Sequence, residues 1–429
     1  MTLELAQAGP TLPAMEYVEV ELVRRSRLDR MRAARAVDGV RPALAAPPAH
    51  GERARDLAAA VGGAVVSTCQ RPVVLVEHRE PLACRLDGLR HLPEPVDPAL
   101  PLILLDTETT GLGTGAGTFP FLVGVGRWEG DEFVTRQLLL PEQSDEAGYL
   151  AALAELIPPD ACLVSYNGRS FDWPLLVTRY RLHGQAAPSL AGHLDLLPLA
   201  RTLWRHRLAD ARLASVEAAV CGVRRAHDLP GGLVPARYLD YLRSGHGGLL
   251  REVLEHNRQD VVSMALLLRV LARDLAPVCA TRAAPTSVHP GDLGGLGRAY
   301  ARKRRVEEAL ACFDTALERL ADGRDVRAYE QVAMERARAL TRLGLRREAE
   351  GAWHAIALEG GRQAALAWLH VAKHREHDAQ DLHAALAATD RARSLAERAR
   401  FFGRRDRVVE RDLARRVARL RRRLAASAT

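Results

Sequence analysis

The chain has 429 residues, enough for two to four domains of ordinary size. Hydrophobic residues make up 48% of it and charged residues 27%, a balance that excludes a largely disordered or low-complexity chain. The formal net charge of +8 is compatible with a nucleic-acid partner but does not by itself define one.

The sequence carries no sign of a membrane or secreted protein. No apolar run reaches the roughly 18–20 residues that a membrane span requires, and the first residues lack the basic and apolar regions of a secretory signal. The six cysteines are scattered without the spacing of a zinc-binding pair. We therefore expect a cytoplasmic protein with free thiols and no membrane partner.

Residues 1–96 are expected to form an N-terminal extension rich in alanine, proline and arginine. It contains a linker at 41–48 and a small β-hairpin whose strands lie at 64–68 and 73–77. Prolines 93, 95, 98 and 101 then indicate a domain boundary.

Residues 97–275 have the pattern of an α/β domain. Short apolar and β-branched runs predict strands at 102–105, 121–128, 133–140 and 161–166. Helices are expected at 145–157, 173–183, 215–221 and 248–275. This order of strands and helices is typical of a layered α/β unit.

Residues 288–429 are expected to be all helical. Small and aromatic residues have the spacing of one tetratricopeptide-like repeat, a helix pair of about 34 residues, at Leu296, Gly297, Tyr300, Ala309, Phe313 and Ala316. A second copy and a third, weaker copy are expected at Ala349, Trp353 and Ile356, and at Ala385, Thr389 and Ala392. The alternative is a bundle of helical hairpins without true repeats.

The positive charge is concentrated at the C-terminus. Residues 391–424 hold 14 arginines and four acidic residues. This arginine-rich helix is expected either to contact nucleic-acid phosphates or to close the repeat array as a solvated cap, and the sequence favours neither.

The first candidate functional feature is the acidic pair Asp106 and Glu108, at the end of the first strand of the α/β domain. Residues i and i+2 of a strand point to the same face, so the two carboxylates are expected side by side. Their repulsion would raise one pKa unless a cation lay between them. Such hard oxygen ligands suit Mg²⁺. The alternative is a solvated strand end with two unrelated acids.

Two further acids follow in the same domain. Asp172 lies between a strand and a helix, where its carboxylate can cap the helix or act at a shared site. His256 and Asp260 are one turn apart on the last long helix and therefore share one face, unless they are merely a solvated pair. Four carboxylates with one histidine would suffice for two-metal phosphodiester hydrolysis. The histidine could take the proton from the attacking water.

These motifs resemble those of the DEDD 3′–5′ exonucleases, which have a ribonuclease H-like fold. The matching stretches are Leu105–Leu112, Asn167–Asp172 and His256–Asp260. A bacterial branch of this superfamily, the YprB-like proteins, is more similar still, through Gly115–Phe121, Asp195–Arg201 and the tetratricopeptide region that follows. The resemblance is strong over residues 100–275.

The resemblance implies a mixed five-stranded sheet flanked by helices and a site that binds two divalent ions, Mg²⁺ or Mn²⁺. The ion ligands would be Asp106, Glu108, Asp172 and Asp260. Leu112 and Phe171 would pack on the terminal nucleotides, and Thr107 and Asn167, in the same motifs, are further candidates for substrate contact.

His256 is the candidate catalytic histidine, in an unusual position. Three residues separate it from Asp260, which is the spacing of the tyrosine-type exonucleases, whereas histidine-type members have four. The two spacings differ by about 100° of rotation on a helix. His256 would then approach the water as the tyrosine does. Nearby, His193 and Asp195 are expected to be a strand end and a helix cap, with support of the site as the alternative.

The leading hypothesis is a metal-dependent nuclease, most specifically a 3′–5′ exonuclease that hydrolyses single-stranded DNA or RNA, with helical repeats that can bind a protein partner. The rival hypothesis is a tetratricopeptide scaffold or nucleic-acid-binding protein whose nuclease-like domain has little or no activity. Intact acids at all four positions favour the nuclease, because a scaffold has no need of mutually repelling carboxylates.

Overall fold

The computed structural model describes residues 51–111, 117–225, 229–276, 278, 285–286, 288–323 and 325–427. The expected linker at 41–48 lies outside these residues, as does Leu112. No helix in the described ranges is both long and apolar enough to cross a membrane.

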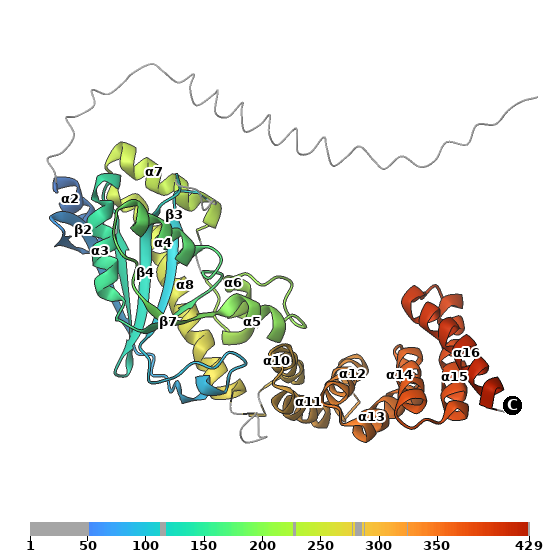
Figure 1. Cartoon of the computed structure of the whole chain (residues 1–429). Coiled ribbons are helices and arrows are strands. Elements are labelled where there is room, and N and C mark those ends of the chain that lie inside the picture. Colours follow the sequence, from blue (N-terminus) through green and yellow to red (C-terminus); the bar gives the residue numbers. More distant parts are fainter. Residues whose placement is uncertain are drawn as a thin grey trace, which may run out of the picture. The chain divides into compact units, whose positions relative to one another are not determined.

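Within the described residues, one mixed sheet of seven strands forms the centre of the α/β region (Figure 1). Its order is β1-β2-β5-β4-β3-β6-β7, in which β3, β6 and β7 run parallel and the other neighbours antiparallel. The strands are β1 (Ala64–Thr68), β2 (Arg71–Glu80), β3 (Leu102–Thr109), β4 (Pro120–Glu129), β5 (Glu132–Leu139), β6 (Ala161–Ser165) and β7 (Leu190–Asp195). The four strands expected in this region and the mixed character of the sheet are confirmed, but the expected number of five strands was wrong, because β1 and β2 add two strands at one edge.

The hairpin of β1 and β2 is also confirmed, but it is not a separate element. Strand β2 pairs with β5 from Val74 opposite Leu139 to Glu80 opposite Phe133, so the hairpin extends the strands β3–β7 of the expected domain. Val73 and Val74 are fully buried in the same core as β4. Because burial of this apolar face stabilises the sheet, residues 64–80 belong structurally to the α/β region rather than to an extension outside it.

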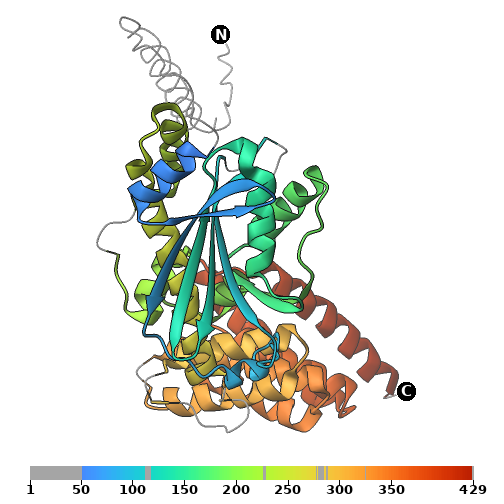
Figure 2. The ribbon, with the colours of Figure 1, turned by 90° about the vertical axis from the view of Figure 1, so that its left-hand side faces the viewer.

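Helices lie on both faces of the sheet (Figure 2). They are α2 (Glu52–Val61), α3 (Glu146–Leu156), α4 (Asp172–Leu182), α5 (Leu196–Leu203), α6 (Leu213–Val216), α7 (Val234–Ser244) and α8 (Arg251–Val270). The four expected helices correspond to α3, α4, α6 and α8, the last two each continued by a π-helical turn. Helices α2 and α7 were not predicted from the sequence, and of α5 only the cap at Asp195 was.

The alternation of residues along β3 determines what each face meets. Leu102 and Leu104 pack in the buried cluster that includes α5 and α8, whereas Ile103 and Leu105 pack in the cluster that includes α3, α4 and α7. Every residue of this run is nearly or fully buried. Asp106 continues the series on the α8 side, so the strand delivers its carboxylate to that helix.

The C-terminal region is all helical in the residues described. It comprises α10 (Pro290–Arg302), α11 (Val306–Leu320), α12 (Val326–Leu343), α13 (Arg346–Glu359), α14 (Ala364–His377), α15 (Leu382–Phe401) and α16 (Arg407–Ser427). The helices pack as successive antiparallel neighbours. Between α10 and α11, a Cβ on Gly297 would lie 2.5 Å from the ring of Phe313, so the small residue permits the close approach that the sequence predicts.

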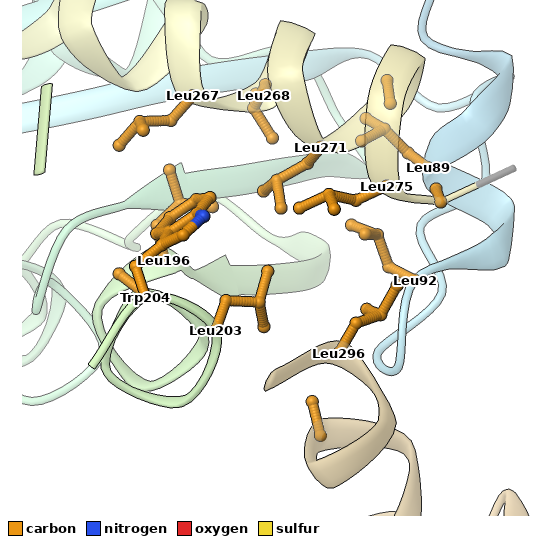
Figure 3. Close-up of a cluster of buried hydrophobic side chains, with 14 of the residues drawn as sticks. Leu89, Leu92, Leu196, Leu203, Trp204, Leu267, Leu268, Leu271, Leu275 and Leu296 are labelled. Carbon is orange, nitrogen blue, oxygen red and sulfur yellow. The ribbon is translucent and has the colours of Figure 1, made fainter. Parts of the chain in front are cut away.

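One apolar cluster joins the α/β region to the first of these helices (Figure 3). Leu203 and Trp204 at the end of α5 pack in the same buried cluster as Leu271 of the turn after α8 and Leu296 of α10. Trp204 is 1% exposed and is therefore a core residue. The backbone of Leu203 also touches α10, where a Cβ on Gly295 would lie 2.3 Å from the Leu203 carbonyl oxygen.

Candidate active site

Asp106 is held at the end of β3 by a helix that lies 151 residues further along the chain. The Nδ2 of Asn257 donates to the Asp106 carboxylate at 2.9 Å and to its backbone carbonyl at 3.2 Å. Asn257 lies on α8 and is 0% exposed. The bond fixes the carboxylate by a neutral donor, so the negative charge of Asp106 remains available to a cation.

Asn257 is itself held in place from the sheet. The Nε2 of Gln137 on β5 donates to the Asn257 Oδ1 at 2.8 Å and to the Leu254 carbonyl at 2.8 Å. Between them lies Gly124 of β4, directly opposite Asp106 in the sheet. A Cβ at Gly124 would lie 2.3 Å from the Asn257 Oδ1, so only glycine leaves room for this amide chain.

Asp172 reaches the same strand from the other side. The Thr107 hydroxyl donates to the Asp172 Oδ1, and Asp172 is buried as the first residue of α4. The N-cap position of α4 is Phe171, which makes no side-chain cap bond. The N-cap interpretation of Asp172 was therefore wrong. Its carboxylate instead accepts a hydrogen bond from Thr107 of β3, beside Asp106 and Glu108.

The loop before Asp172 is organised by Asp195. Its carboxylate accepts from the backbone N–H of Asn167 at 2.8 Å, of Arg169 at 3.2 Å and of Leu197 at 3.0 Å. Asp195 therefore caps α5, as expected, and also supports the motif that leads to Asp172. His193 lies within β7, two residues before its end, and its Nε2 is 2.8 Å from the Ser165 hydroxyl, so it helps to fix the neighbouring strand.

Asp260 and His256 lie on α8, facing the acids of β3. The His256 Nε2 is 3.8 Å from the Glu108 Oε1 and 3.9 Å from the Asp260 Oδ2. The other oxygen of Asp260 accepts from the Arg225 guanidinium at 2.5 Å. Arg225 also binds the buried Glu217 at 2.6 Å.

Burial and mutual repulsion dominate the electrostatics of this group. Burial raises the pKa of Asp106 well above its usual range, and the nearby charges of Asp260, Glu108 and Asp172 raise it further. Burial raises the pKa of Asp172 to about 6, although the Thr107 hydroxyl opposes this shift. Burial also raises the pKa of Asp260, while Arg225 and His256 lower it. A bound cation would relieve this repulsion.

The other three acids lie close enough to Asp106 to raise its pKa, but the four acids are not closed into a compact ligand cage. In the described ranges, one group of three potential metal ligands has all its ligand atoms within 4.8 Å of one another. It consists of His206, His289 and Asp292 and lies outside this site. The acids of the site instead bind Asn257, Thr107 and Arg225. The donor set of four carboxylates fits hard divalent ions. Asp260 would bind such an ion through its Oδ2, or through Oδ1 after the hydrogen bond from Arg225 breaks.

The candidate substrate contacts are placed less uniformly. Phe171 is half-buried beside Asp172, and Asn167 is exposed in the left-handed region with a φ of 73°. The Thr107 hydroxyl is occupied by Asp172, so it positions an acid rather than facing a ligand. Leu112 lies outside the described residues.

Sequence reasoning missed the residues that hold the acids. Asn257 stands within the His256–Asp260 motif, and its position there was the signal available. Arg225, Glu217 and Gln137 carry no motif at all. Their roles follow only from the fold that brings them beside α8.

Comparison with known proteins agrees with this architecture. Residues 103–272 match the family described as the RNase_H superfamily. A Bacillus subtilis protein named YprB, described as uncharacterized, is 40% identical to this chain over 184 residues. That alignment covers 41% of this chain and 44% of YprB, so the chain matches less than half the length of this relative.

These matches and the sheet define the central part of the chain as a ribonuclease H-like domain. Membership of this superfamily suggests a nuclease-type function for the domain. The domain is followed by an all-helical region.

Proposed function

We propose that this protein is a metal-dependent 3′–5′ exonuclease that hydrolyses single-stranded DNA or RNA. The observation that carries the proposal is the convergence of Asp106, Glu108, Asp172 and Asp260 with His256 at one end of β3, in a ribonuclease H-like domain. The four acids and the histidine come from one strand and two helices. A scaffold would gain nothing from the repulsion between the four carboxylates.

The four carboxylates would hold two Mg²⁺ or Mn²⁺ ions. Such ions, when bound, lower the pKa of a water nucleophile and stabilise the leaving oxygen. Asp106 lies centrally, because the other three acids all act on its pKa. Asn257 orients this carboxylate, and Thr107 orients that of Asp172. The protein thus sets the direction of the ligands before any ion binds.

His256 is the proposed proton acceptor. Its Nε2 lies between Glu108 and Asp260, 3.8 Å and 3.9 Å from their oxygens. A neutral imidazole in that place can take the proton of a water that attacks the phosphodiester. The position four residues before Asp260 puts the ring on the same helical face as that acid, which supports a role for the histidine despite its unusual spacing.

An exonuclease, rather than an enzyme that cuts within hybrids, is supported by the stretch Asn167–Asp172, which resembles the exonuclease type. Phe171 lies immediately before the acid and is only half-buried, so its ring is available to a terminal base. The helical region supports a further proposal of tetratricopeptide-like repeats in α10–α15 that bind a protein partner. The free thiols of Cys69, Cys84, Cys162 and Cys221 support a cytoplasmic location.

Metal dependence and the role of Asp106 can be tested together. The wild-type chain and the variants Asp106→Asn and Asp131→Asn are incubated with labelled single-stranded DNA and RNA, with Mn²⁺ or with EDTA. Asp131 is an exposed acid in the β4–β5 turn and serves as the matched control. We expect Asp131→Asn to retain wild-type hydrolysis and Asp106→Asn to fall to the level seen with EDTA. Equal activity of Asp106→Asn and wild type would reject the site, and no hydrolysis by wild type with any divalent ion would favour the scaffold.

A further inference from the structure

A second cluster of metal-ligand side chains lies where the α/β region meets α10. His206 follows the end of α5, His289 is the N-cap residue of α10, and Asp292 lies in the first turn of α10. One ligand atom from each residue lies within 4.8 Å of the other two. The cluster shares no residue with the candidate active site.

The polar atoms of His206 and Asp292 face each other at a distance that a proton or a metal ion would stabilise. The His206 Nδ1 lies 3.3 Å from the Leu203 carbonyl oxygen, which can only accept, so Nδ1 carries the ring proton of the neutral imidazole. The lone pair of Nε2 then faces the Asp292 Oδ1 at 3.3 Å. Two acceptors at this distance repel each other unless a proton or a metal ion joins them.

Asp292 is prepared for such an ion. Its Oδ2 accepts from the Arg207 guanidinium at 2.8 Å, which fixes the carboxylate, while its buried Oδ1 makes no hydrogen bond of full geometry and the Trp204 indole N–H lies close to the carboxylate. The residue is 5% exposed. A buried acceptor without a partner is costly, and a metal at Oδ1 would satisfy it. Arg207 and the Leu203 carbonyl would be the outer partners that orient the ligands, as is usual around bound metals.

The imidazole of His206 is held in place by tight packing. A Cβ at Gly291 would lie 2.4 Å from the His206 ring, so the ring lies directly against the backbone of α10. Trp204 and Leu203, two and three residues earlier, are anchored in the buried cluster beneath (Figure 3). Little side-chain freedom therefore remains to be lost when an ion binds.

His289 completes the set from the exposed side. Its ring stacks on that of His206, with centroids 5.0 Å apart and an interplanar angle of 17°. Its Nδ1 accepts from the Gly291 N–H at 3.0 Å. Ligation through that nitrogen would release an N–H of the first helical turn, a group that has no partner within the helix and can turn to water.

The neighbouring arginines lie against acidic residues, which offset part of their charge. Arg298 and Arg205 lie 3.1 Å and 3.9 Å from oxygens of Glu335, and Arg207 is paired with Asp292 itself. Arg205, Arg298 and the two histidines border a cavity of about 670 Å³. This open side leaves space for a water molecule at a fourth coordination position.

We propose that His206, His289 and Asp292 bind one divalent transition-metal ion of the zinc class, which links the end of α5 to the start of α10. Two imidazoles and one carboxylate suit Zn²⁺, Co²⁺ or Ni²⁺, whereas Mg²⁺ prefers a site made of oxygens alone. This ion is distinct from those of the proposed active site and does not depend on the nuclease proposal.

The test is a titration of the full-length protein with Co²⁺, followed through the visible absorption that imidazole-bound cobalt produces. It is carried out in an Asp106→Asn background, so that the four-acid site is weakened. We expect one equivalent of Co²⁺ to bind and Zn²⁺ to displace it. Adding His206→Ala should abolish the absorption, and adding His289→Ala should weaken binding about tenfold or more. His383→Ala, at an exposed histidine of α15, should leave binding unchanged.

Circular dichroism of the metal-free variants shows whether each is folded. If His206→Ala does not fold, the variant of the exposed His289 still tests the site. Absence of cobalt absorption in the folded protein would mean that a proton alone joins His206 and Asp292, and would overturn the proposal. Absorption that survives both histidine substitutions would overturn it as well. Neither result bears on hydrolysis at Asp106, which is measured separately.

Discussion

Arg225 donates to Asp260 across 2.5 Å, between its Nη2 and the Oδ1 of the acid. The same guanidinium binds Glu217, whose side chain is 1% exposed, while that of Arg225 is 6% exposed. One buried cation therefore neutralises a buried structural acid and restrains an acid of the candidate site. Arg225 therefore contributes both to the stability of the protein and to the geometry of the site.

Arg225→Ala is expected to destabilise the fold strongly. Removal of one partner of a buried ion pair leaves an uncompensated charge on Glu217 and typically costs about 3–5 kcal/mol. The free energy of unfolding can be measured by urea denaturation. Arg224→Ala, at the exposed neighbouring position, is the matched control and should change it little. A loss no greater than that of Arg224→Ala would show that the guanidinium does not carry this charge balance.

Asn257→Ala is expected to lower hydrolysis about 10–100-fold, the usual effect of losing a residue that orients a metal ligand. Gln259→Ala, on the same helix, is the control and should have little effect. Gly124→Ala should reduce activity as well, because its Cβ would lie 2.3 Å from the Asn257 Oδ1.

The substitutions Gly124→Ala and Asn257→Ala can also be combined in one variant. Since both act through one amide, the double variant Gly124→Ala/Asn257→Ala should be less impaired than the product of the single effects. Multiplicative effects would mean that Gly124 and Asn257 act independently and that the amide chain from Gln137 does not position Asp106.

The sequence predicts part of this site and not the rest, for physical reasons. The alternation of residues in a strand places Asp106 and Glu108 together, and the turn of a helix places His256 near Asp260. Local rules do not predict that Gln137, 120 residues before Asn257, holds it by a hydrogen bond. They also left a helix cap open for Asp172, because the Thr107 hydroxyl that binds it lies on a strand 65 residues away.

The fold shows the same division between local and distant information. The hairpin of β1 and β2 follows from β-branched runs and a short turn, but its pairing with β5 depends on Val73 and Val74 becoming buried. The close approach at Gly297 and Phe313 is a spacing within one helix pair and was therefore predictable. The cluster of His206 with Asp292 was not predictable, because it joins distant parts of the chain. The ion pair of Arg207 with Asp292 beside it spans 85 residues.

Gly297→Ala tests the packing of α10 against α11. The added Cβ would lie 2.5–2.9 Å from three atoms of the Phe313 ring, an overlap expected to cost about 1–3 kcal/mol of stability. Gly351→Ala on α13 is the control, because a Cβ there meets nothing within 4 Å. That variant should gain up to about 1 kcal/mol from the higher helix propensity of alanine. Equal effects of the two substitutions on thermal unfolding would contradict the close approach.

His370 is expected to make stability depend on pH. Its ring stacks on Trp353 at 4.0 Å, and burial, followed by Lys373 and Arg338, lowers its pKa from 6.5 to about 4. Between these pH values the unfolded chain binds the proton and the folded chain does not, so stability falls as the pH falls from 6.5 to about 4. His370→Gln should flatten this part of the profile in thermal unfolding. Parallel profiles of the variant and the wild type would refute the assignment.

The direction of hydrolysis is the most direct test of the central claim. Single strands labelled at the 5′ end or at the 3′ end are followed over time with Mn²⁺. For a 3′–5′ exonuclease, the 5′ label should appear in a ladder of steadily shorter strands, and the 3′ label should appear at once as a mononucleotide. Release of the 5′ label first, internal fragments before mononucleotides, or intact strands with every divalent ion would contradict the account.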